Sequence, residues 1–185
     1  MVDRRRGGYC FEHNTLFATV LEELGFGVTR CLGRVRMSNH VDPRPATHMT
    51  LLVDGEVVDV GFGSANPLGP VPLGGEATYG PYTWRTTRAR SPEGEEVWMM
   101  SLLDMALYSF TEAPQHPVDY VTPNHFAATH RLSLFTQVEL TERLPDGAVH
   151  VRTIDAPDYG TTLGDRFGID LDDDDVAQRQ TFLAR

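Results

Sequence analysis

The first residue that can do chemistry is Cys10, which follows two glycines and comes just before or at the start of a helical pattern. A helix N-terminus and nearby positive charge both favour the thiolate, which is the reactive form of cysteine. The glycines permit an unusual backbone and close approach by a substrate. Backbone N–H groups at the same helix start can hold a developing oxyanion. These features predict that Cys10 is a nucleophile.

The second cysteine lacks this setting. Cys31 lies in the middle of a predicted strand, where we expect it to serve packing. Two cysteines without a CxxC spacing, together with seven scattered histidines, do not form a zinc pattern, so no metal is expected. Nor do they form a disulfide framework, which favours a reducing, cytoplasmic location.

A β-hairpin supplies two further candidates. Strand-like runs at 47–53 and 56–60 are separated by Asp54-Gly55, the strongest short-range hairpin signal. With Asp54-Gly55 as a two-residue turn, Thr50 faces Asp59, and side chains alternate between the two faces. His48 and Asp59 therefore point to the same side as diagonal neighbours.

This pair has the chemistry of a base and the group that orients it. A carboxylate beside an imidazole fixes its tautomer and stabilises its charged form. The opposite face of the hairpin is strongly apolar, so the His48–Asp59 side is predicted to be the wall of a site. The residues thus offer a candidate nucleophile in Cys10 and, separately, the base-and-orienter half of a catalytic triad in His48 and Asp59.

The remaining pattern predicts an α+β fold with an antiparallel core. Apolar residues share one face of a predicted helix at 14–24, and 61–81 is expected to be mostly loop because it is rich in glycine and proline. Further strands are predicted at 28–37, 82–87, 97–103, 133–140 and 149–154, and a last helix at 172–183.

Composition narrows the class of function. The 185-residue chain has a net charge of −10, which argues against nucleic-acid and anionic-membrane partners. No apolar run is long enough to span a bilayer, and the basic start of the chain has no apolar segment behind it, so no secretory signal is expected. The oligomeric state is left open.

Several segments resemble one enzyme family. The string from Arg6 to Asn14 (RGGYCFEHN) is similar to the active-site motif of the arylamine N-acetyltransferases. Thr47-His48 resembles the family's histidine segment, and Asp59-Val60-Gly61-Phe62-Gly63 its aspartate segment. The segments that begin at Asn124 and Phe167 resemble the passage into the last domain and the C-terminal pattern. The match is collinear from about Arg5 to Leu171.

The resemblance implies a cysteine-proteinase-like core in three parts: a remnant of a helical bundle at 1–27 with the nucleophile, a β-barrel at 28–118 with the histidine and aspartate, and an α/β lid at 119–185. It joins Cys10 to His48 and Asp59 as a catalytic triad, in which His48 would activate the thiol and Asp59 would orient His48. It also implies a ping-pong reaction in which acetyl-CoA acetylates Cys10 and the acetyl group passes to an arylamine or arylhydrazine. Phe62 and Gly63 would border the acyl and amine pocket. Thr47 and Phe135 would contact CoA or the acceptor.

Alternatives remain at this point. Members of the family carry several dozen residues before the cysteine, which implies a misassigned or truncated start, or a reduced and inactive relative. Some relatives are amide synthases that close a macrolactam in polyketide biosynthesis. A thiol hydrolase or transglutaminase-like protein would use the same Cys-His-Asp logic on another fold.

Overall fold

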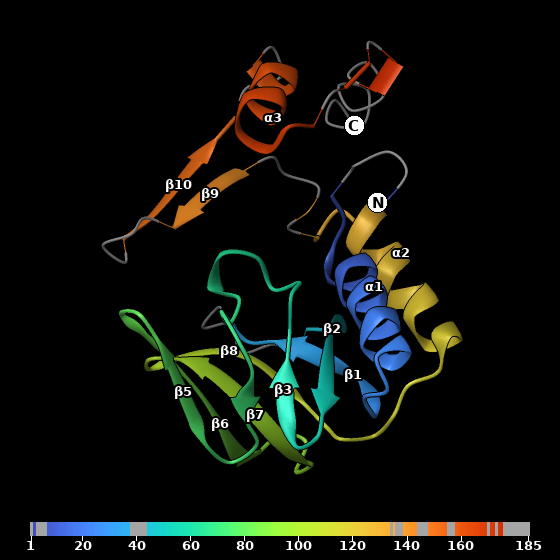
Figure 1. The fold of residues 1–185 in the computed structure, drawn as a ribbon, viewed down its shortest axis with the longest axis vertical. Coiled ribbons are helices and arrows are strands. Elements are labelled where there is room, and N and C mark those ends of the chain that lie inside the picture. Colours follow the sequence, from blue (N-terminus) through green and yellow to red (C-terminus); the bar gives the residue numbers. More distant parts are fainter. Residues whose placement is uncertain are drawn as a thin grey trace. The chain divides into compact units, whose positions relative to one another are not determined.

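Figure 1 shows the chain as a computed structural model. The structure describes residues 2, 7–37, 44–133, 135, 139–143, 148–154, 158–169, 171–172 and 174–175. They belong to two compact units, Gly8–Phe126, and Met1–Gly7 with Ala127–Arg185. The three domains predicted above, with boundaries after residues 27 and 118, stay a prediction.

The described residues of the unit Gly8–Phe126, called the first unit below, form one long helix, eight strands and shorter helical segments. In chain order these are α1 (Cys10–Glu23), β1 (Val28–Val35), β2 (Ala46–Val53), β3 (Glu56–Val58), η1 (Gly63–Ala65), β4 (Val71–Pro72), β5 (Glu76–Tyr79), β6 (Tyr82–Arg90), β7 (Glu96–Leu102), β8 (Met105–Phe110), η2 (Pro117–Tyr120) and the first turns of α2 (Val121–Thr129).

The strands form a nearly closed antiparallel barrel, which confirms the predicted α+β fold. Their order is β4-β3-β2-β1-β8-β7-β6-β5. Strand β4, at one end of this order, meets β6, the strand next to the other end, at Thr86. Its hydroxyl donates to the carbonyl of Pro72 on β4 (2.6 Å) and accepts from the N–H of Gly74 (2.8 Å). The Thr86 N–H donates to the carbonyl of Gly75 (2.9 Å), so the sheet curls back on itself.

The barrel interior is a core of aromatic and aliphatic side chains. Trp84, Tyr108, Met100 and Leu107 are fully buried there. Cys31 belongs to the same cluster, which confirms its predicted packing role.

Helix α1 lies against β2 beside the barrel (Figure 1). It begins at Cys10, four residues before the predicted 14–24 helix. Helix α1 buries Phe11, Asn14 and Ala18, whereas Leu16, Val20 and Leu24 of the apolar row are exposed. Polar ties made by Asn14 fix this orientation, and apolar periodicity carries no signal for them.

The β2–β3 hairpin has the predicted register. Val53 pairs with Glu56 and Leu51 with Val58, across a turn in which Asp54 and Gly55 both have positive φ, of 50° and 83°, as the two-residue turn requires. However, β3 ends at Val58, two residues earlier than predicted. Strand pairing does not continue to Val60, because its backbone N–H donates to the Asn14 side chain (3.1 Å).

Other predicted strands need correction. The strands at 28–37, 82–87 and 97–103 exist with shifted ends, but the glycine-rich stretch 61–81 also contains the short strands β4 and β5, and β8 was missed. The strand predicted at 133–140 was wrong at its start. There the Ser133 hydroxyl donates to the Ala127 carbonyl of α2. This side chain–backbone bond replaces the strand pairing that was predicted for Ser133.

The second unit contains the end of α2, the antiparallel pair β9 (Glu139–Arg143) and β10 (Val149–Thr153), and α3 (Tyr159–Phe167). Strand β10 matches the prediction at 149–154. Helix α3 was not predicted; it ends at Gly168, whose φ of 62° is that of a left-handed cap. Most of the helix predicted at 172–183 lies outside the described residues. Within the described residues, no helix has the length and apolarity to cross a membrane.

Candidate active site

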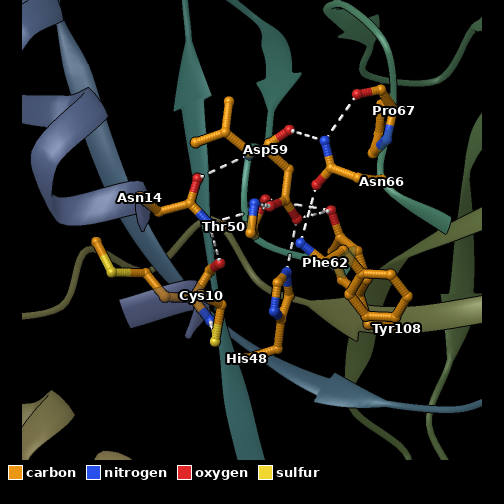
Figure 2. A network of polar contacts seen from close by, with 12 residues as sticks. Cys10, Asn14, His48, Thr50, Asp59, Phe62, Asn66, Pro67 and Tyr108 are labelled. Atoms are coloured by element: carbon orange, nitrogen blue, oxygen red, sulfur yellow. Dashed lines mark hydrogen bonds and ion pairs between the residues drawn. The ribbon is translucent and has the colours of Figure 1, made fainter. Parts of the chain in front are cut away.

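Cys10 is the first residue of α1, with its side chain turned toward β2 (Figure 2). The backbone N–H of Met49 donates to the sulfur (3.5 Å), and the thiol lies 3.6 Å from the carbonyl oxygen of Thr47. A helix N-terminus and a backbone N–H both stabilise negative charge on an atom at this position. The structure therefore sets the Cys10 sulfur beside a helix N-terminus and a backbone N–H donor, in a residue that is only 3% exposed.

The residues around Cys10 explain why the helix begins there. The Glu12 carboxylate folds back and accepts the Tyr9 backbone N–H (2.8 Å), which caps the first turn. A Cβ at Gly8 would lie 2.8 Å from the Glu12 Cβ, so a side chain at that position would displace the cap. The other Glu12 oxygen accepts from the Asn124 side chain of α2 (3.1 Å).

His48 on β2 meets Asp59 as the hairpin register predicts. The His48 Nε2 lies 2.6 Å from the Asp59 Oδ2, and both residues are buried. Figure 2 shows the imidazole between the Asp59 carboxylate and Cys10. Since Nε2 faces Asp59, Nδ1 is the ring nitrogen left to exchange a proton with the thiol. The structure thus brings together the three residues predicted as a triad.

Charge and burial act in opposite directions on this pair. Burial lowers the pKa of His48, but the Asp59 charge and hydrogen bond, together with Cys10, outweigh it and raise that pKa to about 10. Burial raises the pKa of Asp59, and the His48 charge with hydrogen bonds from His48, Asn14 and Gly61 brings it below its ordinary value. At neutral pH the pair is therefore an imidazolium beside a carboxylate.

Two aromatic residues enclose the imidazole. The Tyr108 hydroxyl on β8 donates to the Asp59 Oδ2 (2.9 Å) and lies 3.2 Å from the Thr50 hydroxyl. Burial, with the nearby Asp59 charge, raises the pKa of Tyr108 well above its ordinary value, so the phenol stays a donor. Phe62 packs edge-on against the His48 ring, with 4.9 Å between ring centroids. Sequence reasoning missed Tyr108, which lies 49 positions from Asp59 and on a strand that was not predicted.

Asn14 and Gly61 are further neighbours of the site, and the sequence analysis did not select them. The Asn14 amide donates to the Asp59 Oδ1 (3.0 Å) and to the Met49 carbonyl (2.7 Å). Gly61 donates its N–H to the Asp59 Oδ1 (2.9 Å) and packs directly on Cys10. A Cβ at Gly61 would lie 2.6 Å from the Cys10 Cα. Their position inside the motifs that carry Cys10 and Asp59 is the signal that could have found them.

The other predicted contact residues lie at different places. Thr47 is next to the thiol through its carbonyl, and Gly63 begins η1 with a φ of 80°, which favours glycine. Phe135 belongs to the second unit, where it is 45% exposed. In the described part of the chain, no group of three or more His, Cys, Asp or Glu side chains is arranged to hold a metal ion.

Comparison with known proteins identifies the family. A family model for N-acetyltransferases matches residues 1–149, most of the chain. This chain belongs to the arylamine N-acetyltransferase family of enzymes. It is 35% identical to the arylamine N-acetyltransferase of Mycolicibacterium smegmatis, over 94% of this chain and 72% of that protein.

Solved structures of the family have the same fold. The arylamine N-acetyltransferase of Mycobacterium abscessus superposes with a TM-score of 0.83 at 32% identity, covering 98% of this chain and 74% of that one. The enzyme of Mycobacterium marinum, solved in complex with CoA, gives a TM-score of 0.77 at 31% identity, over 99% of this chain and 76% of that one. The chain therefore matches about three quarters of the length of each of these family members.

Proposed function

We propose that this N-acetyltransferase moves an acetyl group from acetyl-CoA to the nitrogen of an arylamine or arylhydrazine, through an acetyl-cysteine formed on Cys10. The observation that carries the proposal is the buried His48–Asp59 contact of 2.6 Å beside a thiol at a helix N-terminus. The CoA complex of the M. marinum relative supports acetyl-CoA as the donor. Membership of the family supports the acceptor class.

In the first half-reaction the Cys10 thiolate attacks the acetyl carbonyl carbon. The carbon–sulfur bond to CoA breaks, and His48 gives its proton to the departing CoA thiolate, so that free CoA leaves. In the second half-reaction the amine nitrogen attacks the acetyl-cysteine, His48 accepts the amine proton, and the Cys10 thiolate is restored. Asp59 holds the imidazole in one orientation and stabilises its charged form throughout.

The substrate contacts follow from what surrounds these atoms. Phe62 lies edge-on to the His48 ring and forms an apolar border to the acyl and amine pocket. Gly63 follows it and leaves room there, since no atom lies within 4 Å of a Cβ built at that residue. Thr47, beside the thiol, and Phe135, in the second unit, are proposed to contact CoA or the acceptor.

The test separates the two half-reactions. The protein is incubated with acetyl-CoA without an amine, and its intact mass is measured, with Cys10→Ser as the control. An added acetyl group on the wild type, absent from the variant and removed by an arylamine, is the expected result. If the folded wild type gains no acetyl group, the acetyl-cysteine route is wrong.

A further inference from the structure

Asn14 is a polar side chain with no exposed surface, and it uses both ends of its amide. Its Nδ2 group donates to the Met49 carbonyl (2.7 Å) and to the Asp59 Oδ1 (3.0 Å), and its Oδ1 accepts the Val60 N–H (3.1 Å). A buried amide costs free energy unless its groups are paired, and here the two donors and the acceptor are paired. A residue of this kind fixes the segments to which it binds.

Those segments are the ones that carry the site. Asn14 comes four residues after Cys10 on α1, so the two side chains share a face of the helix. Met49 follows His48 on β2 and also donates its N–H to the Cys10 sulfur. One asparagine therefore joins the helix of the thiol, the strand of the imidazole and the loop of the carboxylate (Figure 2).

Asn14 also decides which oxygen of Asp59 faces the histidine. The Asn14 amide and the Gly61 N–H both bind the Oδ1, which leaves the Oδ2 to His48 and to the Tyr108 hydroxyl. We infer that Asn14 is a positioning residue: it sets the distance between the thiol and the imidazole and holds Asp59 in its orienting rotamer. The inference deepens the proposed function and rests on it.

The consequence for pH follows from the groups around the carboxylate. Asp59 faces His48 from β2, Tyr108 from β8, and the helix end with Cys10 and Asn14. Hydrogen bonds from Asn14 and Gly61 add to the effect of His48 in lowering the pKa of Asp59. Removing the Asn14 donor raises the pKa of Asp59, so Asp59 is protonated, and stops supporting the imidazolium, at a higher pH. The acidic limb of the profile, in which Cys10 reactivity falls as the pH is lowered, therefore moves to higher pH.

The experiment measures alkylation of Cys10 by iodoacetamide between pH 4 and pH 9, located by peptide mass, for the wild type and Asn14→Leu. Leucine has a similar size but no polar group. We expect alkylation about 10- to 100-fold slower at neutral pH and an acidic limb about one pH unit higher. Asn14→Asp is the second variant. It keeps an oxygen that can accept from Val60, but it has one donor when protonated and none when ionised. The ionised form also puts a second charge beside Asp59, so its deficit grows with pH.

Two controls distinguish positioning from loss of stability. Asn124→Ala removes a different asparagine–carboxylate bond to α1, the one to Glu12. Thr86→Val removes the buried hydroxyl that joins β6 to the Pro72 carbonyl of β4, a bond that involves no residue of the triad. Both are expected to keep the wild-type pH profile, even where the melting temperature falls.

The inference is overturned if folded Asn14→Leu keeps the wild-type alkylation rate and pH profile. If the leucine variant does not fold, Asn14→Asp takes its place in this comparison. The inference is also overturned if Thr86→Val shifts the pH profile as much as the Asn14 variant does. Because alkylation needs neither acetyl-CoA nor amine, this result is independent of whether an acetyl group is transferred. A wild type that is alkylated with the expected profile but gains no acetyl group would leave the role of Asn14 intact and refute the proposed function.

Discussion

The junction of α1 with the β2–β3 hairpin and the interior of the barrel each contain one buried cysteine, and the two differ in what surrounds the sulfur. Cys10 meets a helix N-terminus, a backbone N–H and the His48–Asp59 pair. Cys31 lies among apolar side chains, where burial raises the pKa of its thiol to about 12. Burial alone therefore does not separate the two residues.

The two cysteines differ in the polar groups that other segments of the chain place around the sulfur. At the junction every segment presents a donor or an acceptor: Met49 a backbone N–H, Asn14 an amide, Gly61 another N–H. In the barrel interior, the weak contact of Cys31 with the carbonyl of Thr29 (3.9 Å) is a local one within its own strand. A nucleophile requires the first environment, and a packing residue requires the second.

The largest effect is expected from Cys10→Ser. A hydroxyl is far less acidic than a thiol, and His48 already carries its proton at neutral pH. We expect acetyl transfer to fall by as much as about 10⁶-fold, with little change in melting temperature. Steady-state kinetics with acetyl-CoA and an arylamine provide the measurement. Activity in the variant within about tenfold of wild type would place the nucleophile elsewhere.

The second largest effect is expected from Asp59→Asn. The amide keeps the shape of the carboxylate but does not favour the imidazolium, so transfer should fall on the order of 10⁴-fold. The dependence of its melting temperature on pH provides a separate readout.

In the wild type the pKa of His48 rises from an ordinary 6.5 to about 10. The folded state therefore holds a proton that the unfolded state has lost, and this part of the stability is complete below about pH 6.5 and disappears as pH rises toward 10. Melting temperatures between pH 6 and pH 10 should fall more steeply for the wild type than for Asp59→Asn. Parallel curves would contradict the ion pair.

A smaller effect is expected from Gly61→Ala. The new Cβ would lie 2.6 Å from the Cys10 Cα, so the helix end or the Asp59 loop must shift. Misplacement of about 1 Å in a reacting group costs about 10²-fold in rate. Gly55→Ala is the matched control, because Gly55 is a nearby glycine, in the turn before β3, with no atom within 4 Å of its built Cβ; its positive φ costs stability only. Equal rate losses in the two variants would remove Gly61 from the site.

The smallest effect on catalysis is expected from Cys31→Ala. The change removes one sulfur from a packed core, which should cost roughly 1–2 kcal/mol of stability. Acetyl transfer should stay within about twofold of wild type at temperatures where the variant is folded. Urea unfolding together with kinetics tests both parts, and a large rate loss in the folded variant would mean that the barrel interior takes part in the chemistry.

The sequence was enough to pair His48 with Asp59, because the Asp54-Gly55 turn and alternation of side chains are local rules. It also predicted different surroundings for the two cysteines, with Cys10 at a helix start and Cys31 in a packed strand, and the structure has both. It could not show that β3 stops at Val58, because the competing hydrogen bond comes from Asn14, 46 positions earlier. Tyr108 reaches Asp59 only because β8 pairs with β1 and β1 with β2, a tertiary arrangement without a local pattern. The buried face of α1 could not be read from its apolar row for the same reason, since the polar ties of Asn14 to β2 and to the Asp59 loop orient the helix.

Contacts within the hairpin join residues that are close in the chain, whereas contacts between the helix end and the hairpin join distant residues. This difference predicts an order of folding. His48 and Asp59 are 11 residues apart and can meet as soon as the hairpin closes, whereas the ties from α1 to Met49, Asp59 and Val60 span 35 to 46 residues. Short loops close earlier than long ones. During refolding the dyad should therefore form before the thiol arrives, and the return of Cys10 reactivity would time the docking of the helix onto the barrel.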